Sequence, residues 1–126
     1  MAINSREKGR RGEIELAHKL REHGYSTRRG QQYSGTETSA DVVGLPGIHI
    51  ECKRVEALNI YTAIMQAVHD TGESGDLPAV FHRKNNQPWL VTMRLEEWLA
   101  PYRGWAEAGG AAGQHRKLGR HNLGLR

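Results

Sequence analysis

The stretch SADVVGLPGIHIECKR (residues 39–54) carries the pattern that decides the fold. Two apolar runs, 40–45 and 48–55, flank a Pro-Gly pair, and this arrangement predicts two strands joined by a tight turn. Pairing of these strands as a hairpin brings Asp41, near the start of the first strand, close to Glu51 in the second. The sequence therefore places two carboxylates side by side in a segment that is otherwise suited to burial.

The second strand has two different faces, because successive side chains of a strand point to opposite sides. Ile50 and Cys52 lie on the apolar face, where we expect Cys52 to be a small buried hydrophobic residue and not a redox group. The other face carries His49, Glu51 and Lys53. One interpretation of this face is an exposed ion pair between Glu51 and Lys53, which would contribute little to stability.

The proximity of Asp41 supports a catalytic interpretation of the same face. Two neighbouring carboxylates repel each other, and a divalent cation is the ordinary way to offset that repulsion. Mg²⁺ typically binds one or two carboxylates together with waters and a phosphate oxygen. A lysine at the position of Lys53 can hold an attacking hydroxide and stabilise charge on phosphorus.

A third acid comes from a helix that the apolar periodicity predicts over residues 9–23. Three apolar residues follow Glu13 at helical spacing, so Glu13 lies on the apolar face of this helix. A carboxylate in that position needs a partner or a metal, and we favour the metal over a cap or a salt bridge. Glu15 points away from this face and is expected to pair with Lys19 in solvent.

The rest of the chain alternates strands and helices. After the first helix we expect strands at 25–29, 40–45 and 48–55, a helix at 56–72, strands at 77–84 and 88–94, and a closing helix at 95–103. This order predicts an α/β domain with a mostly covered central sheet. From Gly104 to Arg126 the periodicity is lost, and we expect a domain of residues 1–103 followed by a flexible basic tail.

Composition narrows the class of protein. The 126 residues include 18 Lys and Arg against 14 Asp and Glu, for a net charge of +4. A polyanionic partner and a merely basic protein are equally compatible with that charge. One cysteine excludes an internal disulfide, and the absence of a GxxxxGK[ST] motif argues against a nucleotide cofactor. With no apolar leader or membrane-length stretch, we expect a cytoplasmic protein that does not bind membranes.

Asp41, the Glu51-Cys52-Lys53 run and the helical Glu13 together resemble the PD-(D/E)XK nuclease superfamily. The longer pattern GRRGEIELAHKLREHGYSTRRG, followed by SADVV and IHIECKR, resembles the archaeal-type Holliday junction resolvases and their phage relatives. The resemblance is close over residues 8–55 and continues as gross topology to about residue 103. It implies a restriction-endonuclease-like core in which helices flank a central mixed five-stranded sheet.

The resemblance also implies roles for individual residues. The implied metal ligands are Glu13 (directly or through water), Asp41, Glu51 and the backbone carbonyl of Cys52. Lys53 would position the nucleophilic water, and Ser34 would be the family's mobile loop serine near the scissile strand, with Ser39 as a competing match. The residues that would contact DNA phosphates are Arg10, Arg11, Arg28 and Arg29.

The implied activity is Mg²⁺-dependent cleavage of branched DNA, with Mn²⁺ as a substitute ion. A resolvase of this type acts as a homodimer and makes paired symmetric nicks in a four-way junction. One alternative is another nuclease of the same fold, of the restriction, repair or flap-cutting type. A catalytically silent DNA-binding module is a third interpretation. The presence of the four key side chains argues against it: Glu13, Asp41, Glu51 and Lys53.

Three further expectations concern the faces of the elements. An apolar stripe on the second helix, formed by Tyr61, Ile64, Met65 and Val68, is either core or a dimer interface, and core is the more common outcome. Gln66 falls on a polar stripe of the same helix and is expected in solvent. His49 is expected to be solvated or hydrogen-bonded rather than part of the site.

Overall fold

The computed structural model describes residues 5–30 and 40–110, and its elements follow the predicted order. The helices are α1 (Ser5–Glu22), α2 (Ile60–Thr71) and α3 (Leu95–Glu107). The strands are β1 (Arg28–Arg29), β2 (Val42–Val43), β3 (Ile48–Arg54), β4 (Leu77–Arg83) and β5 (Leu90–Thr92). The chain divides into two compact units, Met1–Met93 and Arg94–Arg126, and α3 belongs to the second.

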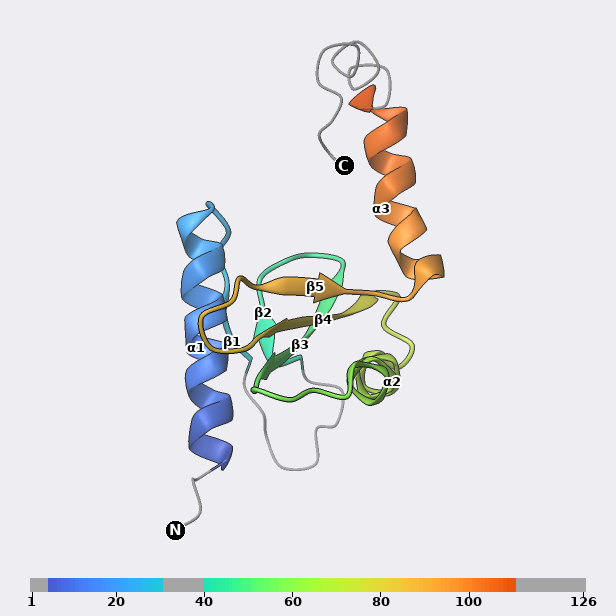
Figure 1. Ribbon diagram of the computed structural model, residues 1–126. Coiled ribbons are helices and arrows are strands. Elements are labelled where there is room, and N and C mark those ends of the chain that lie inside the picture. The colour runs from blue at the N-terminus through green and yellow to red at the C-terminus, as the bar shows by residue number, and fades with distance from the viewer. Residues whose placement is uncertain (1–4, 31–39, 111–126) are drawn as a thin grey trace. The chain divides into compact units, whose positions relative to one another are not determined.

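Within the described residues the five strands form one mixed sheet in the order β1-β2-β3-β4-β5. Strands β3 and β4 are parallel, and the other neighbours are antiparallel. A parallel pair needs a crossover between its strands, and α2 supplies it. Figure 1 shows α1 and α2 on opposite sides of this sheet. The predicted α/β fold, with a central mixed sheet flanked by helices, is confirmed.

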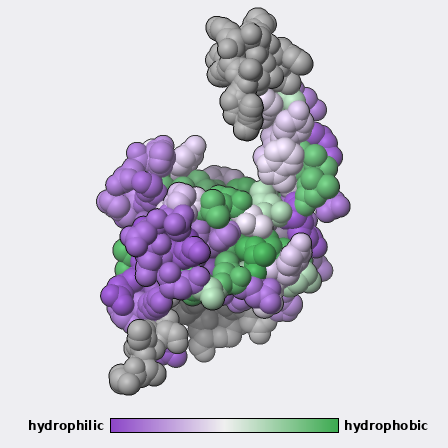
Figure 2. Space-filling view, in the orientation of Figure 1, coloured by the Kyte–Doolittle hydropathy of each residue, from purple (hydrophilic) through white to green (hydrophobic). Residues whose placement is uncertain are grey.

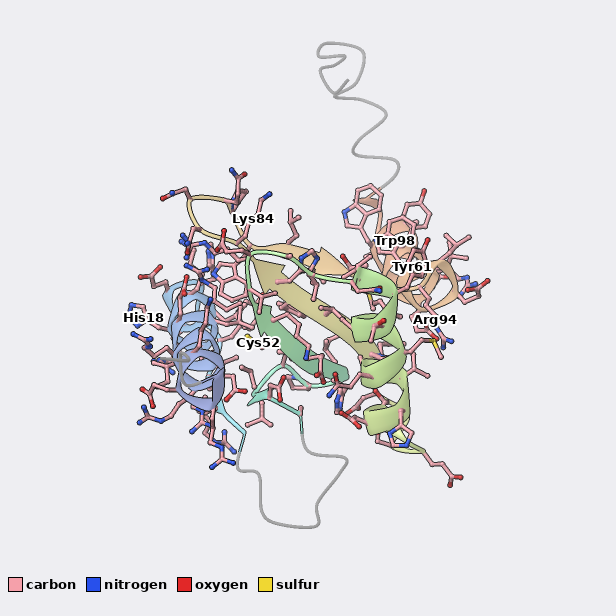
Figure 3. The ribbon with its side chains drawn as sticks, turned by 60° about the horizontal axis from the view of Figure 1, so that its bottom comes forward. His18, Cys52, Tyr61, Lys84, Arg94 and Trp98 are labelled. Atoms are coloured by element: carbon pink, nitrogen blue, oxygen red, sulfur yellow. The ribbon has the colours of Figure 1, made fainter. Side chains whose placement is uncertain are left out.

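The two faces of the sheet are buried by different helices. On one face Leu16 and Ala17 of α1 pack with Ile50 and Cys52 of β3. Cys52 is only 9% exposed, and in Figure 3 it lies between α1 and the sheet, as the strand alternation predicted. On the other face three residues of α2 pack against Val80 of β4. The polar face of β3, which carries Glu51, therefore lies on the α2 side of the sheet.

The apolar stripe predicted on α2 is only partly buried in the structure. Its N-terminus is capped by Asn59, whose side chain accepts a hydrogen bond from the backbone N–H of Thr62. Ile64 is buried against the sheet, whereas Tyr61 and Met65 are 83% and 58% exposed. The stripe therefore splits into a core half and a half that remains available for an interface.

Helix α3 runs four residues beyond its predicted end, to Glu107. Trp105 continues the helical spacing of Trp98 and Tyr102, and their rings form a ladder with centroid distances of 5.2 and 5.8 Å. This apolar spacing was the signal of a longer helix. The predicted domain boundary at residue 103 falls inside α3 and stays a prediction, since residues 111–126 of the expected tail lie outside the described part.

The outer surface of α1 is strongly hydrophilic, as the space-filling view shows (Figure 2). His18 and Lys19 pair there with Glu22, at 3.1 and 3.8 Å, and Arg10 pairs with Glu7. None of the helices in the described ranges combines the length and apolar character that crossing a membrane requires.

Candidate active site

The pairing of β2 with β3 brings Asp41 and Glu51 together. Val42 is the antiparallel partner of Ile50, so Asp41 lies opposite Glu51. The backbone N–H of Asp41 donates to the carbonyl of Ile50 at 2.9 Å. This register is the one that the LPG turn predicted.

The Asp41 carboxylate occupies the edge of β3 at the point where β2 begins. Its Oδ2 accepts a hydrogen bond from the backbone N–H of Cys52 at 2.8 Å. Cys52 and Ile50 are two residues apart, so their backbone groups point to the same side of the strand. The carbonyl of Cys52 is therefore directed to the same edge as the Asp41 side chain.

Glycine allows the segment after β1 to approach this edge. The backbone N–H of Gly30 donates to the carbonyl of Asp41 at 2.8 Å. A Cβ on residue 30 would lie 2.0 Å from the carbonyl oxygen of Ala40, which no other residue could tolerate without a backbone shift. Close packing at Gly30 thus holds Arg28 and Arg29 beside Asp41.

Glu51 is a buried carboxylate with a perturbed pKa. Its residue is 3% exposed, beneath α2. Burial raises the pKa of Glu51 to about 7, and the Asp41 carboxylate contributes to the increase. Lys53, whose Nζ lies 3.6 Å from Oε2 of Glu51, opposes it. A carboxylate that ionises near neutral pH is poised to exchange its proton for a cation.

Lys53 is held by a second partner that sequence reasoning missed. Its Nζ donates to Oε1 of Gln66 at 3.3 Å. Gln66 is exposed, as expected, but its side chain also reaches across from α2 to the lysine. The sequence signal for this contact was that Gln66 lies on the helix that directly follows the Glu51-Cys52-Lys53 run.

Glu13 lies between α1 and the sheet, and its side chain is 13% exposed. Its Oε1 accepts a hydrogen bond from Nε of Arg29 at 2.8 Å. Burial raises the pKa of Glu13, the Arg29 hydrogen bond lowers it, and the Asp41 charge raises it again. The expected position on the apolar face is confirmed, and the side chain that contacts Glu13 is Arg29.

The prediction for Glu15 was wrong. Glu15 pairs with Arg54 at 3.1 Å and with Arg83, and not with Lys19. These contacts tie α1 to the ends of β3 and β4. Side chains separated by 39 and 68 residues meet there, which helical spacing alone does not reveal.

The prediction that His49 is solvated was wrong. His49 is 4% exposed, and its Nε2 has no hydrogen-bond partner among the described residues. Burial lowers its pKa, against the opposing charges of Asp70, Asp41 and Asp76. The ring therefore lies under α2, on the same face as Glu51, with a polar atom left unsatisfied.

The four arginines expected to contact DNA differ in their surroundings. Arg10 is exposed and pairs with Glu7, and Arg11 is exposed beside a hollow of about 300 Å³ that Lys8 and Arg54 help to line. Arg28 is exposed on β1. Arg29 differs from Arg10 in that its partner, Glu13, is itself a candidate site residue. Ser34 and Ser39 lie outside the described residues.

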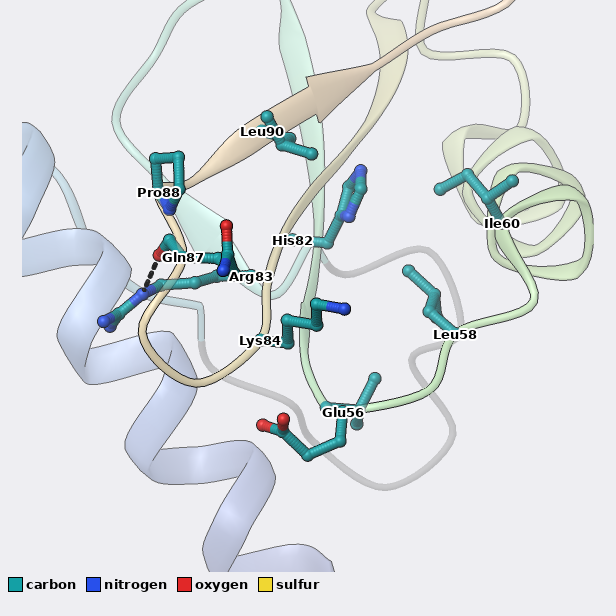
Figure 4. A pocket seen from close by; sticks show the side chains of 10 residues that line it. Glu56, Leu58, Ile60, His82, Arg83, Lys84, Gln87, Pro88 and Leu90 are labelled. Atoms are coloured by element: carbon teal, nitrogen blue, oxygen red, sulfur yellow. Dashed lines mark hydrogen bonds between the residues drawn. The ribbon is translucent and has the colours of Figure 1, made fainter.

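A larger hollow of about 350 Å³ opens one strand away from the site (Figure 4). Apolar side chains of Leu58, Ile60 and Leu90 line it together with His82, the register partner of Lys53. His82 is hydrogen-bonded to Thr92 at 2.8 Å. None of the candidate acids is among the residues that line this hollow.

The donor set at the acidic edge suits a hard divalent cation. Asp41 and Glu51 are neighbouring carboxylates, and the Cys52 carbonyl points to the same edge, so all the donors are oxygens. Within residues 5–30 and 40–110, no three His, Cys, Asp or Glu side chains lie close enough to form a metal cluster by themselves. A cation held here would need backbone oxygen, water or phosphate as further ligands, which is the usual situation for Mg²⁺.

Comparison with known proteins agrees with this geometry. The family model described as "Phage putative PDDEXK endonuclease" matches residues 4–108. The chain belongs to this family. The predicted membership of the PD-(D/E)XK nuclease superfamily is thereby confirmed.

Among solved structures, the chain is similar to Hjc, a Holliday junction resolvase from the archaeal hyperthermophile Archaeoglobus fulgidus. The match has a TM-score of 0.51 and 22% sequence identity, and it covers 68% of this chain and 72% of Hjc. At that identity the likeness shows the fold. No curated protein matches the chain.

Proposed function

We propose that the protein is a metal-dependent DNA endonuclease that cuts four-way junctions, that is, a Holliday junction resolvase. The observation that carries the proposal is the grouping of Asp41, Glu51 and Lys53 where β2 begins beside β3, with Glu13 close enough to interact electrostatically with Asp41 and Lys53. Membership of a PD-(D/E)XK endonuclease family and the Hjc-like fold support nuclease chemistry. The choice of a junction as substrate rests on the resemblance in sequence and fold to resolvases.

The residues at the edge of β3 have complementary roles in this proposal. Asp41, Glu51 and the Cys52 carbonyl would hold Mg²⁺, or Mn²⁺ in its place, with Glu13 as a direct or water-mediated ligand. When bound, such an ion lowers the pKa of water and neutralises charge on the phosphate.

Lys53 would orient the attacking water and stabilise charge that develops on phosphorus, because its ammonium group lies 3.6 Å from Glu51. Gln66 would restrict the lysine to this position through its 3.3 Å hydrogen bond. In-line attack on the phosphodiester would leave 5′-phosphate and 3′-hydroxyl ends.

The basic residues suit recognition of backbone and shape rather than base sequence. Arg10, Arg11 and Arg28 are exposed and belong to the same unit as the acidic edge. Phosphate contacts of this kind give affinity and strong salt dependence without sequence information. Two copies of the protein related by a two-fold axis would place one acidic edge at each of two symmetry-related DNA strands of the junction. The exposed Tyr61 and Met65 are available for such an interface.

The test is cleavage of a fixed four-way junction beside linear duplex, flap and single-stranded DNA, with Mg²⁺ and with EDTA. We expect paired symmetric nicks in the junction alone. The nicks should disappear with EDTA and with Asp41→Asn, and they should persist with Glu73→Gln, which removes an exposed carboxylate outside the site. Metal-dependent cutting of the other substrates would assign the protein to a different nuclease class of the same fold. Tight binding without any cutting would leave a silent DNA-binding module.

A further inference from the structure

The Glu13–Arg29 ion pair joins a candidate metal ligand to a candidate DNA contact. The two side chains come from α1 and β1, are 16 residues apart, and meet at 2.8 Å. Glu13 is 13% exposed and Arg29 is 39% exposed, so the carboxylate is enclosed while the guanidinium reaches solvent. A single contact thus connects the interior of the site with its surface.

The backbone fixes Arg29 at this place. Arg29 is the register partner of Val42, the residue after Asp41. The next residue, Gly30, donates its N–H to the carbonyl of Asp41 and has no room for a Cβ. Arg29 therefore cannot drift from the acidic edge as a whole, although its side chain is long enough to change partners.

Arg28 provides the natural comparison. It precedes Arg29 on the same strand and, because side chains alternate, points to the opposite side. It is exposed, and among the ion pairs between described residues none involves Arg28. Both arginines are thus close to the site, and only Arg29 is engaged by an acid of that site.

Two cations cannot share an enclosed carboxylate without repelling each other. Because Arg29 is paired with Glu13, a divalent cation that bound this carboxylate would have to displace the guanidinium or be repelled by it. Displaced from Glu13, the same guanidinium would retain its charge and its bidentate geometry, which suit a phosphate.

We propose that Arg29 and the divalent cation compete for Glu13, and that the displaced Arg29 then binds a DNA phosphate. The metal and the DNA are thereby coupled through one side chain. This inference rests on the proposed function, because it assumes that the same edge binds both a cation and DNA. It makes Arg29 a DNA-binding residue whose contact with DNA is conditional on the metal.

The test measures binding of a junction in EDTA and in Ca²⁺, under conditions in which cleavage is absent, for wild type, Arg29→Gln and Arg28→Gln. We expect Arg29→Gln to weaken junction binding about fivefold in Ca²⁺ and to leave it unchanged in EDTA. Arg28→Gln should weaken binding equally in both. Glu13→Gln releases Arg29 without a metal, so it should tighten junction binding in EDTA, and adding Arg29→Gln should cancel that gain.

A second arm measures binding of Mn²⁺ alone by electron paramagnetic resonance. Arg29→Gln should raise the affinity for Mn²⁺ in the absence of DNA, since the competing cation is gone. An equal loss of junction binding in EDTA and Ca²⁺, or an unchanged or lower Mn²⁺ affinity, would overturn the coupling. If junction cleavage in Mg²⁺ persists in that case, the proposed function survives. Failure of the wild type to bind the junction in either condition would overturn both.

Discussion

Replacement of Glu51 by glutamine should stabilise the metal-free protein at neutral and alkaline pH. Glu51 is 3% exposed, and burial together with the Asp41 charge raises its pKa from 4.5 to about 7. Because the folded state binds the proton more tightly than the unfolded chain does, folding stability decreases as the pH rises from about 4.5 to about 7. Above that range the folded protein carries the full cost of a buried, ionised carboxylate.

The size of this cost follows from the two pKa values. The interval between 4.5 and about 7, at about 1.36 kcal/mol for each pH unit, corresponds to about 3 kcal/mol. Glutamine has nearly the same shape and does not ionise, so Glu51→Gln should avoid the whole loss. The variant should be about 3 kcal/mol more stable than wild type at about pH 8, and the difference should shrink to below about 1 kcal/mol at about pH 5.

Urea unfolding in EDTA at these two pH values measures the difference directly. Glu73→Gln is the matched control, because it removes an exposed carboxylate and should change stability equally little at both pH values. Saturating Mg²⁺ should then stabilise wild type more than Glu51→Gln, since the variant lacks one of the carboxylates that bind the ion. A Glu51→Gln protein that is no more stable than wild type at about pH 8 would refute the conclusion that burial and the Asp41 charge destabilise the ionised form of Glu51.

Three further predictions concern the surroundings of the site. Gly44→Ala should lower the free energy of unfolding by at least about twice the roughly 1 kcal/mol expected for Gly47→Ala. Both glycines have a positive φ, but only at Gly44 would an added Cβ lie 2.4 Å from a backbone oxygen. Equal urea midpoints for the two variants would contradict this. Gln66→Ala should slow single-turnover junction cleavage roughly five- to tenfold without changing junction affinity, because one hydrogen bond that orients the lysine is removed; weaker binding would instead indicate a DNA contact. Arg10→Ala combined with Arg11→Ala should reduce the salt slope of junction binding by roughly 0.9 for each phosphate that these arginines neutralise, and an unchanged slope in a salt titration would exclude both residues from the interface.

Structural features that depend on residues close together in the sequence were predicted correctly. The order of helices and strands follows from local apolar periodicity and from turn residues, both of which can be read within a dozen positions. The same holds for the central pair of acids, since a tight turn leaves one register in which Asp41 and Glu51 face each other. The burial of Cys52 followed from strand alternation alone.

Contacts between elements were not predictable in this way. Helical spacing identified Glu13 as a buried acid, but Arg29 as its partner depends on how β1 packs beside α1. Lys53 meets Gln66 only because α2 crosses over the polar face of β3. The spacing of residues along a helix does not show which side chains of neighbouring elements its residues will contact. Glu15 is an example, because it pairs with Arg54 of β3 and not with Lys19 of its own helix.

The sequence by itself determined the elements, their order and the placement of an acid pair beside a lysine, because these depend on local backbone geometry and short turns. Only the tertiary structure decided the pKa of Glu51, since that value depends on the burial that α2 imposes and on the distance to Asp41. It also decided that Arg29 lies against Glu13. Desolvation and ion pairing are properties of the packed interior, and side chains far apart in sequence create them together.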